Sequence, residues 1–110
     1  MEREQANGVG IDSTLATLRA HEPELRAVGV LGASLFGSVA RGDAGLDSDI
    51  DVAVRLAENF STGGFDYFWQ LEQLQKHLSR LCGCKVDVVV EPVRKQRLQS
   101  EIDKDRALVY

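Results

Sequence analysis

The fold is decided by residues 27–54, which read AVGVLGASLFGSVARGDAGLDSDIDVAV. Residues 27–36 are apolar, small and uncharged, and this composition predicts a strand buried on both faces. Residues 41–48 are dense in glycine, aspartate and serine, which indicates a turn or loop. From Asp49 to Val54 acidic and aliphatic residues alternate, so we expect a second strand after the turn.

The second strand carries a pair of carboxylates. Side chains alternate along a strand, so Asp49 and Asp51 point to the same face. Two like charges side by side are costly unless a cation lies between them, and Mg²⁺ prefers such oxygen ligands. Alone, this pattern would favour a solvated sheet face over a metal site. Asp87 adds a third acid within an otherwise aliphatic run, where an acid is expensive to bury unless it faces the same site.

Gly37 and Ser38 stand directly after the first strand and before the polar turn. A glycine there allows a ligand to approach the backbone, and the amide groups that follow can bind an anion. Ser38 adds a hydroxyl donor. A strand, a phosphate cradle and a strand with two carboxylates together make the minimum apparatus for handling a nucleoside triphosphate.

Helices and further strands are expected on both sides of this stretch. Apolar residues at helical spacing predict a helix from Asp12, which Asp12 or Ser13 can cap. The clearest helix is expected over 65–82, with a core stripe of Tyr67, Leu71, Leu74, Leu78 and Leu81. A third strand over 85–90, a basic helix over 93–103 and a last strand or tail over 107–110 complete one mixed α/β domain over 1–110, whose residues 1–10 are a loose end.

The composition argues against several classes of protein. The 110 residues carry 17 acidic against 13 basic side chains, a net charge of -4, which argues against gripping nucleic-acid phosphates directly. No apolar stretch approaches the roughly 18 residues that span a membrane, and the start has no signal-peptide pattern. Cys82 and Cys84 suit two reduced thiols better than a zinc site, so we expect a cytoplasmic protein without a membrane partner.

The motifs resemble a known family. Leu35 to Gly42, followed by Asp47 to Asp51, closely resembles the minimal nucleotidyltransferase (MNT) branch of the DNA polymerase β-like nucleotidyltransferase superfamily. This branch includes antitoxins paired with HEPN-domain toxins. The likeness extends to Val86 to Val89 and covers the chain from about residue 27 to its end. It implies the polymerase β-like fold, a small mixed sheet flanked by helices.

The resemblance also implies site roles. Gly37 and Ser38 would bind the triphosphate of ATP, while Asp49 and Asp51 would hold two Mg²⁺ ions. Asp87 would complete one metal site and help to deprotonate the attacking hydroxyl. The reaction implied is transfer of AMP with release of pyrophosphate.

The residues themselves leave the role of Arg41 open. It could reach the phosphates, or it could anchor the loop by pairing with Asp43 or Asp47.

The expected strands and helices use nearly every residue, so none remain to bind the molecule that accepts the nucleotide. We therefore expect the acceptor to be a macromolecule that brings its own docking surface. In the family this partner is a HEPN ribonuclease toxin, silenced when a tyrosine receives AMP, and we expect a hetero-oligomer with it. Two alternatives stay open: an antitoxin that acts by tight complex formation without catalysis, and a small-molecule nucleotidyltransferase of the aminoglycoside type.

The long helix predicts a partner interface. Phe65 and Trp69 fall opposite its core stripe, and a tryptophan on a polar face is a candidate anchor for a partner. The alternative is that Phe65 staples the start of the helix and Trp69 covers a neighbouring loop.

Overall fold

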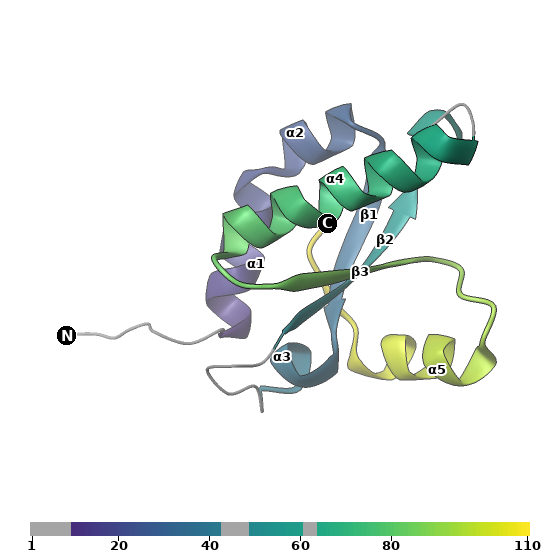
Figure 1. Ribbon diagram of the computed structural model, residues 1–110. Helices are drawn as coiled ribbons and strands as arrows, with labels where there is room; N and C mark the ends of the chain where they lie inside the picture. The colour runs from purple at the N-terminus through teal and green to yellow at the C-terminus, as the bar shows by residue number, and fades with distance from the viewer. Residues whose placement is uncertain (1–9, 43–48, 61–63) are drawn as a thin grey trace.

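The computed structural model describes residues 10–42, 49–60 and 64–110, apart from the side chains of residues 59, 64 and 65 (Figure 1). None of the helices in these segments is long and apolar enough to cross a membrane. In chain order the elements are α1 (Ile11–Ala20), α2 (Glu22–Ala27), β1 (Val30–Phe36), α3 (Gly37–Arg41), β2 (Ile50–Leu56), the 3-10 helix η2 (Glu58–Phe60), α4 (Gly64–Cys82), β3 (Val86–Val90), α5 (Gln96–Asp105) and β4 (Ala107–Leu108).

The strands form one mixed sheet in the order β3-β2-β1-β4. β1 runs antiparallel to both β2 and β4, whereas β2 and β3 are parallel and are joined through α4. A parallel pair needs such a crossover, because the chain must return to the starting edge of the sheet. The predicted mixed sheet flanked by helices is confirmed.

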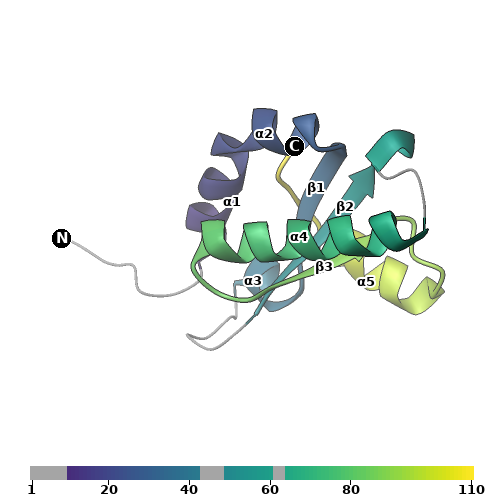
Figure 2. The ribbon, with the colours of Figure 1, turned by 45° about the horizontal axis from the view of Figure 1, so that its top comes forward.

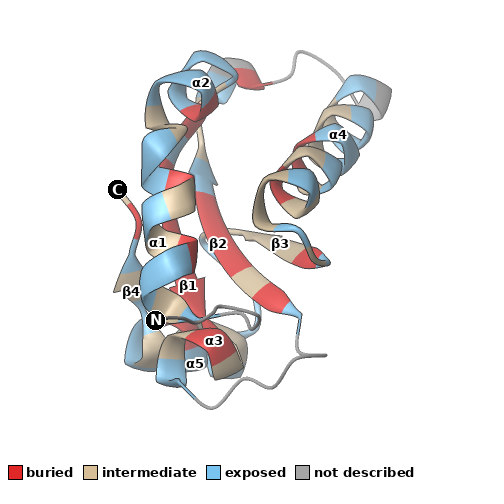
Figure 3. Ribbon diagram, turned by 90° about the vertical axis from the view of Figure 1, so that its left-hand side faces the viewer, coloured by how far each residue is buried: buried red, intermediate tan, exposed pale blue. Residues whose placement is uncertain are grey.

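Helices cover the sheet unequally on its two faces. α1, α2 and α4 lie on the first face, where their leucines pack against alternate residues of β1 and β2 (Figures 1 and 2). The predicted stripe of α4 supplies part of this core, since Leu74 and Leu78 are buried and Tyr67, Leu71 and Leu81 pack against them. Figure 3 shows that the buried positions of α4 turn toward the sheet and the exposed ones away from it.

The second face is covered by α5 over only part of its area. Ile102 of α5 is fully buried against Phe36 and Ala53, which point away from the first core. Asp51 and Arg55 flank Ala53 at alternate positions of β2, so they belong to the same second face. This face therefore carries one apolar patch with charged residues on either side of it.

Element boundaries differ from the sequence predictions at several places. The first strand begins at Val30 rather than residue 27, because α2 continues to Ala27 and Gly29, at φ 101°, turns the chain into the sheet. α1 starts after Gly10, without the predicted side-chain cap from Asp12 or Ser13. The basic helix is displaced to Gln96–Asp105. The predicted loose end, apart from residue 10, lies outside the described residues.

Candidate active site

Strand register brings two of the predicted carboxylates together. Phe36, the last residue of β1, pairs with Asp51, and Asp51 pairs with Asp87 across the parallel β2–β3 ladder. Neighbouring strands lie about 4.8 Å apart, so the two acids are adjacent on the second face. Asp49 directly precedes β2 and is exposed. Carboxylates from two strands thus meet at the end of β1 where α3 begins.

Gly37 is the first residue of α3 and packs directly on Asp51. Its φ of 76° lies in the left-handed region, which side chains rarely adopt. A Cβ at this position would lie 2.5 Å from Oδ2 of Asp51, closer than any carbon can approach. Ser38 follows at the second position of α3 and is half-buried. The glycine therefore lets the start of α3 close onto the carboxylate.

The site concentrates negative charge. Burial raises the pKa of Asp51, and the neighbouring charges of Asp87 and Asp49 raise it further, while Arg41 acts in the opposite direction. Lys85 Nζ lies 3.9 Å from both Asp49 Oδ2 and Asp87 Oδ1, so one ammonium group stands between two of the acids. A cluster that raises the pKa of its own most buried member is a place where a cation is favoured.

Arg41 has a different described partner from the two expected for it. Its Nη1 donates to Oδ2 of Asp105 at 2.8 Å, and that side chain is only 9% exposed at the end of α5. Asp43 and Asp47 lie outside the described residues. The ion pair joins α3 to α5, so Arg41 fixes the helix that begins at Gly37 while its charge still acts on Asp51.

The donor set fits Mg²⁺ in chemistry, since it consists of carboxylate oxygens gathered at one sheet edge. Asp51 lies at the centre of this set, where burial and the charges of Asp87 and Asp49 raise its pKa and a bound cation would oppose that rise. Within the described ranges, however, no three acidic, histidine or cysteine side chains converge closely enough to hold one ion as they stand. Lys85, spaced evenly between Asp49 and Asp87, occupies part of the region in which those oxygens could meet.

The sequence profile of the nucleotidyltransferase domain matches residues 18–110, which include all of these elements except most of α1. The chain belongs to the nucleotidyltransferase family. It is 38% identical over 96 residues to the protein adenylyltransferase MntA of Thermococcus cleftensis, covering 84% of this chain and 87% of that protein. A relative from Methanocaldococcus jannaschii, assigned as a protein adenylyltransferase, is 32% identical over 95 residues, covering 84% of this chain and 89% of that protein.

Solved structures agree with this assignment. A protein assigned as a minimal nucleotidyltransferase superposes with a TM-score of 0.71 at 28% identity, covering 89% of this chain and 94% of that one. The same fold occurs in a tri-AMPylated HEPN toxin–MNT antitoxin complex of Shewanella oneidensis, with a TM-score of 0.61 at 18% identity over 88% of this chain and 71% of that one. The predicted likeness to minimal nucleotidyltransferases and the prediction of a nucleotidyltransferase enzyme are therefore confirmed.

Two contacts of the site escaped sequence reasoning. Lys85 stands two residues before Asp87, so the alternation of the third strand could have placed both on one face. Asp105 carries no such signal, because its contact with Arg41 spans 64 residues of chain and depends on how α5 packs.

The predicted interface residues lie on α4, on the far side of the sheet from the carboxylates. Trp69 is 61% exposed, as predicted, and Phe68 beside it is 70% exposed. The side chain of Phe65 lies outside the described residues. Trp69 borders a groove of about 400 Å³ between α2 and α4, which Val28, His77 and Arg80 also line. The predicted exposure of Trp69 is confirmed, and its role stays a prediction.

The contact of Gly37 with Asp51 gives a sharp mutational test. We expect Gly37→Ala to lower nucleotidyl transfer about 100-fold, because the methyl group must displace the Asp51 carboxylate, and to cost about 1–2 kcal/mol in backbone strain. Transfer rates and urea unfolding measure the two effects. Gly42→Ala is the control, since Gly42 has a φ of 81° but open space around an added Cβ. Equal loss of activity in both variants would contradict the assigned contact.

Proposed function

We propose that this chain is a Mg²⁺-dependent antitoxin that transfers AMP from ATP to a tyrosine of a HEPN ribonuclease partner and thereby silences it. The observation that carries the proposal is the register of Asp51 with Asp87 beside the first turn of α3. The names of two archaeal relatives as protein adenylyltransferases support the reaction, and the toxin–antitoxin complex that shares the fold supports the partner.

Gly37 and Ser38 would hold the triphosphate. The first amide groups of a helix have no carbonyl partner within the helix, so those of α3 are available to phosphate oxygens. The hydroxyl of Ser38 adds a donor. The ion pair of Arg41 with Asp105 keeps α3 in place against the sheet, which would fix the phosphates relative to the carboxylates.

Asp49, Asp51 and Asp87 would hold the metal ions. Bound Mg²⁺ supplies charge neutralisation for the phosphates and alignment of the attacking and leaving oxygens. Asp87 would accept the proton of the tyrosine hydroxyl as its oxygen bonds to the α-phosphorus. The bond from that phosphorus to the bridging oxygen breaks at the same time, and pyrophosphate leaves. Lys85 would have to move away from Asp49 and Asp87 for this arrangement to form.

Two labelled substrates test the reaction. With a HEPN partner present, label in the α-phosphate of ATP should appear on the partner, whereas label in the γ-phosphate should leave as pyrophosphate. Mass spectrometry should detect a tyrosine of the partner that carries AMP. Chelation of divalent cations should stop the transfer. Label from the γ-position on the partner would instead indicate a kinase and would overturn the proposal.

Neutralisation by binding alone is a second candidate, favoured by the exposed apolar side chains of Phe68 and Trp69. Large exposed aromatic side chains typically mark interaction sites. The two functions separate in cells that express the toxin. If a variant without Asp49 and Asp51 still protects the cells, binding suffices; if protection is lost while the complex persists, catalysis is required.

Trp69 is expected to anchor the partner. We expect Trp69→Ala to weaken the complex at least 10-fold, because a buried interface tryptophan contributes about 2 kcal/mol or more. Because the side chain is exposed in the free chain, the circular-dichroism spectrum should not change. Calorimetric titration measures the affinity, and Leu108→Ala, another exposed apolar side chain, is the control. If Trp69→Ala bound the partner with unchanged affinity, the prediction that Trp69 on α4 anchors the partner would be wrong.

A further inference from the structure

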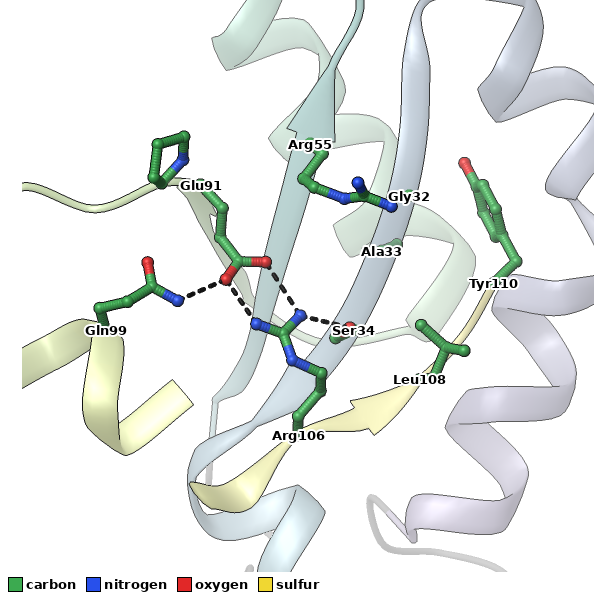
Figure 4. A pocket seen from close by; sticks show the side chains of 10 residues that line it. Gly32, Ala33, Ser34, Arg55, Glu91, Gln99, Arg106, Leu108 and Tyr110 are labelled. Carbon is green, nitrogen blue, oxygen red and sulfur yellow. Dashed lines mark hydrogen bonds and ion pairs between the residues drawn. The ribbon is translucent and has the colours of Figure 1, made fainter. Parts of the chain in front are cut away.

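A second cavity lies on the same sheet face as the carboxylates, at the other end of the strands (Figure 4). Its volume of about 430 Å³ falls in the range of small-molecule sites. Arg55 lines it four residues after Asp51 along β2, which places the cavity roughly 13 Å from the active-site carboxylates. The apolar patch around Ile102 separates the two places, so this cavity is not part of the site described above.

One wall of the cavity is a closed polar network. Arg106 donates to both carboxylate oxygens of Glu91 at 3.0 and 2.6 Å and also to Asp103 at 2.9 Å. Gln99 donates a hydrogen bond to Glu91 at 2.7 Å and accepts one from the backbone amide of Val93 at 2.9 Å. The negative charge of Glu91 is therefore compensated within the wall, and the amide of Gln99 is engaged on both of its sides.

Two donors in the cavity remain unused. Arg55 makes no hydrogen bond or ion pair within the described part of the chain, and its guanidinium extends across β1 above Gly32 (Figure 4). Ser34 is 1% exposed; its Oγ accepts from Arg106 at 3.0 Å, and its own hydroxyl proton has no acceptor among the described residues. A nearly buried hydroxyl without an acceptor is unusual, because buried polar groups are normally paired.

Gly32 makes the position of the guanidinium possible. A Cβ on Gly32 would lie 2.9 Å from an Arg55 amino nitrogen, so any side chain there would displace Arg55. The remaining walls are apolar or aromatic, from Pro92, Leu108 and Tyr110. Within the segments that the structure describes, the cavity thus combines the unpaired guanidinium of Arg55, the free hydroxyl proton of Ser34 and an apolar lining.

We propose that this cavity binds a small oxyanion, a phosphate monoester or a carboxylate, carried on a flat apolar body. The Arg55 guanidinium can only donate and the Ser34 hydroxyl has its proton to donate, and a guanidinium matches the paired oxygens of phosphate and carboxylate. The lining of Pro92, Leu108 and Tyr110 accommodates the body. This binding is independent of the proposed AMP transfer and needs neither a divalent cation nor a protein partner.

The test is an NMR titration of the ¹⁵N-labelled full chain with a chelator present. AMP probes the phosphate monoester and benzoate probes the carboxylate. We expect saturable shifts of the Gly32 and Ser34 amides and of the Arg55 Nε–H. Binding of AMP alone identifies a phosphate ligand, binding of benzoate alone a carboxylate, and binding of both the shared chemistry. No saturable shift with either probe, or shifts at Gly37 and Ser38 only, would overturn the proposal.

Two variants locate the binding. Arg55→Met removes the charge, and Gly32→Ala keeps it but displaces the guanidinium, so each should weaken the Kd about 10-fold or more. Both changes affect the far end of an exposed, flexible side chain, so the circular-dichroism spectra should match that of the unaltered chain. Arg80→Met, an exposed arginine on α4, is the control and should bind as before. Undiminished binding by Arg55→Met would also overturn the proposal.

Discussion

Asp51→Asn is expected to lose nucleotidyl transfer by about 1000-fold or more while becoming no less stable. The loss follows from removing a carboxylate that would hold Mg²⁺, whose positive charge would offset the negative charge on the phosphates. The stability follows from the raised pKa of Asp51, which shows that its ionised form is disfavoured in the fold by burial and by Asp87 and Asp49. A neutral amide relieves that repulsion. The rate of nucleotidyl transfer should therefore fall, while the free energy of unfolding in urea stays the same or rises.

Asp66→Asn is the matched control. Asp66 is an exposed acid in the first turn of α4, so the same substitution should leave transfer within about twofold of the unaltered chain. If Asp51→Asn were clearly destabilised and lost activity only in proportion to the unfolded fraction, Asp51 would be a structural residue. The assigned role for the carboxylate would then be wrong.

Glu91→Ala is expected to cost about 2–3 kcal/mol of unfolding free energy. The Glu91 side chain is only 7% exposed, and it accepts hydrogen bonds from Arg106 and Gln99 at the junction of β3, α5 and β4. Its removal leaves a partly buried guanidinium without its main partner, which costs more than the pair itself contributes. Glu72→Ala is the control, because the exposed Glu72–Lys76 pair, at 3.6 Å, should contribute no more than about 0.5 kcal/mol.

The same pair has a definite pH dependence. Hydrogen bonds from Arg106, more than any other cause, lower the pKa of Glu91 in the folded chain. A carboxyl whose pKa is lower when folded stabilises the fold above its unfolded pKa of about 4.3. That contribution disappears as the pH falls through the lowered value. Urea unfolding of the unaltered chain and of Glu91→Gln should therefore differ at pH 7 and converge in acid; a constant difference would contradict this.

Local patterns predicted the parts of the site that lie within single strands. Alternation predicted Asp51 as a site residue of the second strand, and an acid in the aliphatic third strand predicted Asp87; the β2–β3 register places the two side by side, whereas Asp49 directly precedes β2. The helical stripe around Leu74 and Leu78 was predictable for the same reason, because a period of 3.6 residues is a local property.

Contacts between distant segments were not predictable. The pairing of Arg41 with Asp105 depends on the docking of α5, and the cavity around Arg55 forms only where β1, β2, β3 and the end of the chain meet. The start of the first strand was misplaced because Ala27 and Val28 are as apolar as the strand that follows. Only the positive φ of Gly29 separates helix from strand there.

The parallel pairing of β2 with β3 bears on how the chain acquires activity during folding. β1 and β2 are antiparallel neighbours in the chain, whereas β3 can pair only after α4 has formed and crossed the sheet. Closing such a long segment carries an entropic cost that is recovered only when the last contacts form. Asp51 can therefore meet Asp87 only after β3 has joined the sheet. A nascent chain that stops within α4 would hold Gly37, Ser38, Asp49 and Asp51 but would lack Asp87, so we expect it to transfer no nucleotide.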